Sequence, residues 1–165
     1  MVSDRLPPHD INAEESVLGS ILINNEAFIS VSNILKADDF YREKNKWVYE
    51  AILELFDRGE AIDQVTVANE LVNQDNLEHL GGSNYLAYLV SSVPSSVHVE
   101  EYANVVAKTA QLRQLIRAGS DIVDIGFTDT SDVSESLSRA EKILFKLKEG
   151  RATEDYTLIK EVLEQ

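Results

Sequence analysis

The sequence predicts an all-α protein in which a globular bundle of short helices precedes a long antiparallel helical hairpin and the stub of a linker helix. Apolar residues recur at intervals of three and four, and no segment alternates apolar and polar residues as a half-buried strand would. Glycine and proline mark the ends of the helical segments. We expect residues 1–97 to form a globular head, residues 98–150 the hairpin, and residues 151–165 a linker with the start of its helix.

The first helices of the head have visible starts and stops. Asn12 and Glu15 have the spacing of a capping box, which predicts the start of a first helix. A second short apolar stretch ends at the acidic pair 38–39. Gly59 predicts the C-terminal cap of the clearest helix, whose apolar stripe contains Trp47, Val48, Ala51, Ile52, Leu55 and Phe56.

Two more helices complete the predicted head. Asp63 or Thr66 can cap the N-terminus of a fourth helix. Gly81 and Gly82 open a turn into a fifth helix, because glycine accepts backbone angles that other residues avoid. Pro94 ends the fifth helix, since proline lacks the N–H that the helix would need.

Two long helices joined by a short polar turn follow. No proline occurs from Val97 to Ile125, and a seam with alternating spacings of four and three contains Val105, Thr109, Leu112, Ile116, Gly119 and Val123. Gly126 and Phe127 predict the end of this helix. The second helix repeats the spacing with Val133, Leu137, Ala140, Leu144 and Leu147. We expect Gly150 to end it, and the pair to form an antiparallel hairpin.

The hairpin contains more apolar residues than two narrow seams can bury. Tyr102 and Val106 lie off the first seam but early in the helix, so we expect them to pack on residues 1–97. Other off-seam residues lie nearer the turn, beyond the expected reach of the head, namely Leu115, Ile122, Ile125, Ile143 and Phe145. Because large exposed apolar patches mark interaction sites, we expect this part of the hairpin to self-associate.

The last fifteen residues have a different pattern. A polar stretch at 151–155 is followed by two apolar pairs four residues apart, Leu158 with Ile159 and Val162 with Leu163. This spacing is typical of an amphipathic helix, but the segment is too short to be stable alone. A frayed end or a vector remnant is the alternative. We interpret the segment as a linker helix that docks on another domain or subunit.

Charge and composition restrict the partners. The chain has 29 acidic and 15 basic residues and a formal net charge of −14, and residues 1–97 alone hold 16 acidic and 6 basic residues. Affinity for nucleic acids depends on clustered Lys and Arg, and no such cluster occurs, so we expect no strong DNA binding. The chain lacks cysteine, a signal segment and an apolar run of membrane length, which predicts a soluble cytoplasmic protein without membrane contact.

The sequence contains no pattern typical of a catalytic, cofactor or metal site. The phosphate-binding pattern G-x-x-x-x-G-K-[ST] is absent. His9, His79 and His98 each lack a second histidine at the spacing of metal ligands. The adjacent carboxylates at 14–15 and 38–39 do not face each other on a helix, so we interpret them as capping and solvated residues. We therefore expect no enzyme activity and no cofactor in this chain.

Several short stretches occur in a distinctive order over residues 6–150. They are Pro7-Pro8-His9, Ala13-Glu14-Glu15-Ser16-Val17-Leu18-Gly19, Asp38-Asp39-Phe40-Tyr41, Asp57-Arg58-Gly59 with Ile62-Asp63, Leu80-Gly81-Gly82 with Tyr85-Leu86, Val93-Pro94-Ser95, Tyr102-Ala103, and Leu112-Arg113 with Ile116. Each piece alone is a weak signal. Together, in this order, they resemble the N-terminal domain of the DnaB-type replicative DNA helicases.

The resemblance implies the assembly and partner-docking region of a bacterial replicative helicase. Family hairpins pair between subunits, the hexamer carries a collar that is a trimer of dimers, and primase and helicase loader proteins bind it. An ATP- and Mg²⁺-dependent motor would follow residue 165, with the linker helix docked on a neighbouring motor. By position in the matching stretches, Tyr85, Ile116 and Ile122 resemble residues of the primase-facing or hairpin interface.

Two alternatives remain open from the residues alone. The first is a free-standing acidic helical adaptor that dimerises through its hairpin, which a gene ending near residue 165 would favour. The second is a small enzyme whose site is assembled from distant residues. The absence of any recognisable catalytic motif argues against the second alternative.

Overall fold

The computed structural model describes residues 5–128 and 132–163, with side chains described for 5–128 and 132–150. Every regular element in these residues is a helix, which confirms the predicted all-α class. The chain divides into two compact units, residues 1–111 and 112–165. The side chains of Leu158, Ile159, Val162 and Leu163, assigned above to a linker helix, lie outside the described residues.

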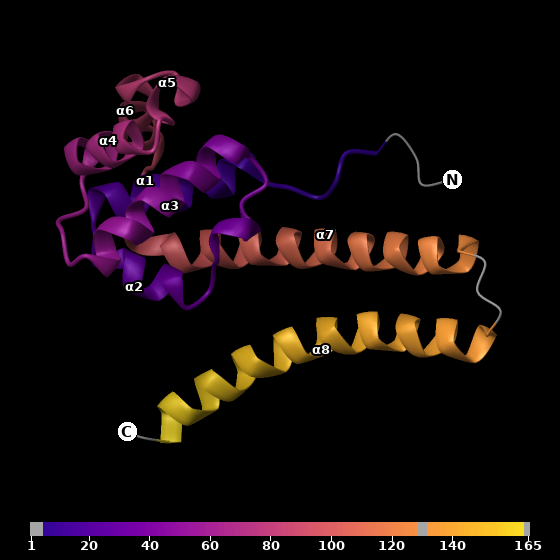
Figure 1. Ribbon diagram of the computed structural model, residues 1–165. Helices are drawn as coiled ribbons and strands as arrows, with labels where there is room; N and C mark the ends of the chain where they lie inside the picture. Colours follow the sequence, from indigo (N-terminus) through magenta and orange to yellow (C-terminus); the bar gives the residue numbers. More distant parts are fainter. Residues whose placement is uncertain (1–4, 129–131, 164–165) are drawn as a thin grey trace. The chain divides into compact units, whose positions relative to one another are not determined.

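Unit 1 consists of six short α-helices, two 3₁₀ turns and the first turns of a long helix (Figure 1). The elements are α1 (Ile11–Ile23), α2 (Ala27–Ser32), η1 (Ala37–Asp39), α3 (Glu43–Asp57), α4 (Gln64–Asn73), α5 (Leu77–Leu80), α6 (Ser83–Ser92), η2 (Ser96–His98) and the beginning of α7 (Val99–Phe127). Unit 2 contains the rest of α7 and α8 (Val133–Leu163), which run antiparallel.

The core of unit 1 forms between α1, α3 and α6. The apolar stripe of α3 is buried at Val48, Ala51, Ile52 and Leu55, as its 3.6-residue period predicts. Helices α1 and α6 lie so close that a Cβ added at Gly19 would stand 2.2 Å from the carbonyl oxygen of Leu89. Glycine at this position therefore sets the distance between the two helices.

The first turns of α7 belong to the head core. Val106 is fully buried there, and Tyr102 packs against the core as a partly buried residue, as their early position predicted. Val99 and Ala103 are buried in the same cluster. The compact head therefore extends to residue 111, about four helical turns beyond the expected boundary at residue 97.

Several of the predicted helix ends are confirmed. The carboxylate of Asp63 accepts hydrogen bonds from the N–H groups of Val65 and Thr66 at the start of α4. Gly59 has a φ of 68°, and Gly81 and Gly82 also have positive φ, which glycine adopts without strain. Helix α6 ends before Pro94, as expected.

Two predicted helix ends are wrong. The N-cap of α1 is Asp10, whose carboxylate accepts from the N–H of Ala13 at 2.9 Å, so Asn12 lies inside the helix. Glu15 is buried in the head. Gly150 does not end α8, which continues to Leu163. A glycine inside a helix costs only about 1 kcal/mol, so it does not stop a helix whose following residues favour helical structure.

Candidate self-association surface on the hairpin

Helix α8 has no buried side chain between residues 133 and 150. Among residues 112–128 and 132–150 of unit 2, the buried side chains are those of Ala118 and Ile125, both on α7. Isolated helices are only marginally stable in water, and most helical stability in proteins comes from packing of an apolar face. The described part of this hairpin therefore lacks the cover that two long amphipathic helices need.

Large apolar side chains are exposed on both helices of unit 2. On α7 they include Ile116, which is 48% exposed, and Val123, which is 50% exposed. On α8 they include Phe145, which is 61% exposed. We call the full set the hairpin face, and it consists of Leu112, Leu115, Ile116, Val123, Phe127, Val133, Leu137, Leu144 and Phe145.

The predicted seam on α7 is wrong in its register. Leu112, Ile116 and Val123 were expected to pack within the hairpin, yet all three are exposed. The inner face instead carries Ala118 and Ile125, both buried. The apolar residues of α7 fit two heptad registers offset by one residue, because residues 115, 118, 122 and 125 also alternate in spacings of three and four.

The structure divides the predicted interface residues into three groups. Leu115, Ile116 and Phe145 are exposed, so they are available to a partner. Ile122 and Ile143 are half-buried. Ile125, only 9% exposed, is covered by its own chain.

Tyr85, which the family resemblance had placed at an interface, is 8% exposed and lies inside the head. Its hydroxyl hydrogen-bonds with the side chains of Asn45 and Glu15, and the ammonium of Lys44 lies 3.7 Å from its ring centroid. Burial, followed by the negative charge of Glu15, raises the pKa of Tyr85. The residue thus joins α6 to α1 and α3, and most of its surface is covered within the head.

Glu14 and Glu15 are buried, with 1% and 5% exposure. The carboxylate of Glu14 accepts from the backbone N–H of Tyr41 at 2.6 Å and from the side-chain amide of Asn45 at 2.8 Å. Glu15 accepts from the guanidinium of Arg42 at 2.9 Å. The two carboxylates hold the chain between η1 and α3 onto α1, so the expectation that they are solvated is wrong.

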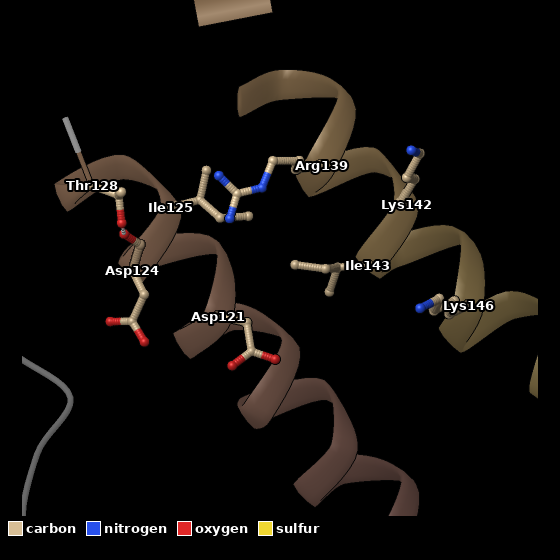
Figure 2. A pocket seen from close by; sticks show the side chains of 8 residues that line it. All are labelled: Asp121, Asp124, Ile125, Thr128, Arg139, Lys142, Ile143 and Lys146. Carbon is tan, nitrogen blue, oxygen red and sulfur yellow. Dashed lines mark hydrogen bonds between the residues drawn. The ribbon is translucent and has the colours of Figure 1, made fainter. Parts of the chain in front are cut away.

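A groove of about 380 Å³ opens within unit 2 between α7 and α8. Figure 2 shows Ile125 of α7 and Ile143 of α8 projecting into the space between the two helices. Charged side chains line both sides, and they are Asp121 and Asp124 on α7 and Arg139, Lys142 and Lys146 on α8. The groove thus has an apolar floor, one acidic wall and one basic wall.

The three histidines occupy separate places in the head. His9 stacks on Tyr41 with ring centroids 4.4 Å apart, and the ring of His79 lies beside that of Trp47. Across residues 5–128 and 132–150, no three His, Asp or Glu side chains come together in a way that would hold a metal ion. None of the helices described combines the length and apolar character needed to cross a membrane.

Comparison with known sequences gives consistent matches. The family described as DnaB-like helicase N terminal domain matches residues 6–108. The Replicative DNA helicase DnaC of Bacillus subtilis is 42% identical over 165 residues, and the Replicative DNA helicase DnaB of Mycobacterium leprae is 40% identical over 162 residues. The chain spans 36% and 27% of the length of these two relatives.

Solved structures share the fold. The N-terminal domain of the DnaB helicase from Mycobacterium tuberculosis is 41% identical, with a TM-score of 0.82 over 86% of this chain and 99% of that one. A DnaB-like replicative helicase described together with its interactions with primase is 24% identical, with a TM-score of 0.71 over 94% of this chain and 35% of that one. Because the family match covers more than half of the chain, this protein belongs to the DnaB-like helicase N-terminal domain family.

Proposed function

We propose that this chain is the assembly and partner-docking region of a bacterial replicative DNA helicase. Hairpins of two copies pair through the hairpin face, and three such pairs form the collar of a hexamer. The collar receives primase and a helicase loader in the cytoplasm. The ATP- and Mg²⁺-dependent motor belongs to the part of such a helicase that lies outside this chain, and the segment 151–165 leads toward it.

The exposed hairpin face is the observation that carries the assembly part of the proposal. Its residues lie on both helices of unit 2, while the side chains described there up to residue 150 include only two buried ones. Burying apolar surface contributes roughly 25 cal/mol per Å², so covering several Leu, Ile and Phe side chains offers a large gain. A second copy supplies an equivalent apolar face, as symmetric interfaces require.

The docking part follows from the family to which the chain belongs. A domain with a fixed helical scaffold and an exposed apolar surface suits a role in holding partners together rather than in catalysis. The curated relatives named above are replicative DNA helicases, and primase is the partner stated for a helicase that shares this fold. We therefore propose primase as a partner of this chain.

Sedimentation equilibrium of Ile116→Glu beside Gln114→Glu tests the assembly part. Both residues are exposed on α7, but they lie two positions apart and so project from opposite sides of the helix. We expect Ile116→Glu to weaken self-association by roughly 100-fold, because an unpaired carboxylate would be buried at the interface. Gln114→Glu adds the same charge and is expected to associate like the wild type. A monomeric wild type at high concentration would contradict the proposal.

Fluorescence anisotropy with labelled primase from the same bacterium tests the docking part. We expect saturable binding to the wild-type chain. Absence of binding at primase concentrations far above the micromolar range would contradict docking while leaving self-association intact.

A further inference from the structure

Among the described residues, the charged side chains on the two walls of the hairpin groove form no ion pair with one another. The carboxylates of Asp121 and Asp124 and the cationic groups of Arg139, Lys142 and Lys146 line the same groove. The ion pairs found among the described residues involve none of these five side chains. The acidic wall and the basic wall therefore lie near each other in one chain without neutralising each other.

The spacing of the wall residues places each charged row beside the apolar floor. On α7, residues 121, 124 and 128 line the groove around Ile125. On α8, residues 139, 142 and 146 line it around Ile143 in the same spacing of three and four. Residues with this spacing share one face of a helix. Each helix thus presents a charged ridge next to an isoleucine.

We infer that the acidic ridge of α7 in one copy pairs with the basic ridge of α8 in a second copy. This inference rests on the proposed self-association and names the residues that decide which surfaces meet. One chain carries both ridges, so two copies can satisfy each other reciprocally, as a two-fold interface requires. No other partner has to supply a complementary pair of ridges.

Charge pairing between the two ridges also offsets the electrostatic repulsion between two acidic copies. Each chain has a formal net charge of −14. At physiological salt, charges further apart than about 8 Å are largely screened, so close contacts dominate. An acidic ridge that faces a basic ridge stabilises the arrangement in which α7 of one copy meets α8 of the other. Two acidic ridges that face each other repel and so destabilise the alternative arrangements. Burial of the hairpin face then provides the affinity between two copies, and the charged ridges determine which surfaces of the two copies meet.

A charge-swap experiment tests the inference. Variant A carries Asp121→Lys and Asp124→Lys, which makes both ridges basic. Variant B carries Lys142→Glu and Lys146→Glu, which turns the α8 ridge net acidic while the α7 ridge stays acidic. Sedimentation equilibrium gives the homodimer affinity of each variant, native mass spectrometry of an equal mixture gives the fraction of A–B pairs, and circular dichroism reports helix content.

We expect each variant alone to associate at least about 10-fold more weakly than the wild type, because like charges face each other across the interface. The mixture is expected to form A–B pairs in preference to either homodimer. A chain that carries all four substitutions is expected to regain self-association.

Three results would overturn the inference. Variants A and B that dimerise as tightly as the wild type would show that the ridges do not meet between copies, although the proposed self-association would stand. Rescue by the fourfold variant without A–B pairing in the mixture would place the charge pairs within one chain. A wild type that stays monomeric would overturn this inference together with the proposed self-association.

Discussion

Two adjacent glutamates of α1 are held in the interior of the head by hydrogen bonds. Glu14 accepts from two backbone N–H groups and from Asn45, and Glu15 bonds with Arg42 and two tyrosine hydroxyls. Every buried side-chain N or O atom among the described residues has a hydrogen-bond partner. Removal of either carboxylate would therefore leave buried hydrogen-bond donors without an acceptor and destabilise the head.

Replacing Glu14 by alanine is expected to lower the free energy of unfolding of the head by about 2–4 kcal/mol. The change leaves the N–H groups of Tyr41 and Arg42 and the amide of Asn45 buried without their acceptor. Urea denaturation followed by circular dichroism measures the difference. Glu54→Ala, at an exposed glutamate of α3, is the control and is expected to change stability by less than about 0.5 kcal/mol.

Gly19→Ala is expected to destabilise the head by about 1–3 kcal/mol, because the added methyl group overlaps the backbone of α6. Gly126→Ala in α7 is the matched control, since a Cβ there meets nothing within 4 Å. Alanine should favour the helix at that position by about 0.5–1 kcal/mol. Thermal unfolding of both variants decides the matter, and an unchanged melting temperature for Gly19→Ala would contradict the close packing of α1 and α6.

The burial of Glu14 could have been predicted from the sequence. Glu14 lies four residues before Leu18 and seven before Ile21, so it belongs to the apolar stripe of α1. A carboxylate on an apolar stripe indicates a buried polar network. Its partners could not have been predicted, because Tyr41, Asn45 and Tyr85 come from segments that only the folded chain brings together.

At the scale of an element, Asp63 stabilises the start of α4. Its carboxylate accepts from the N–H groups of Thr66 and Val65, and these hydrogen bonds hold its pKa below the ordinary value of 3.8. A lowered pKa in the folded state contributes stability above pH 3.8, and this contribution is lost as the pH falls through the lowered value.

Asp63→Ala is therefore expected to cost about 0.5–2 kcal/mol at pH 7. Asp63→Asn keeps a capping oxygen and should cost less. Urea denaturation at a series of pH values checks the sign: the difference between wild type and Asp63→Asn should shrink as the medium becomes more acidic than pH 3.8. A difference that grows on acidification would refute the capping role.

The helices were predictable from periodicity, but their register was not. Apolar stripes and caps identify α3, α4, α6 and the long helices, since these signals are local. The side of α7 that faces α8 depends on tertiary packing, because Ile116 and Ile125 fit different heptad registers equally well. The four-residue helix α5 has too short a pattern to detect.

At the scale of the whole molecule, the negative net charge of this chain opposes binding to DNA. With a net charge of −14, we expect no binding to a labelled single-stranded oligonucleotide at roughly 10 μM protein, since counterion release requires clustered basic residues. Fluorescence anisotropy at low salt, with a basic single-strand-binding protein as positive control, measures this. Tight binding would show that the acidic head does not repel the phosphate backbone.

The division of the molecule was predicted in outline. A helical head and a hairpin were visible because the pattern changes near Val97 from short capped helices to long uninterrupted ones. The compact head nevertheless includes the first turns of α7 up to residue 111. That extension depends on which residues the head core buries, and Tyr102 and Val106 carried the indication of it in the sequence.

Amide hydrogen exchange at several protein concentrations tests most directly whether a second copy covers the hairpin. Because α8 buries no side chain between residues 133 and 150, we predict that its amides exchange slowly in concentrated solution and much faster on dilution. Amides of α1, inside the head, should stay protected at every concentration. Slow exchange in α8 that does not change on dilution would contradict the account.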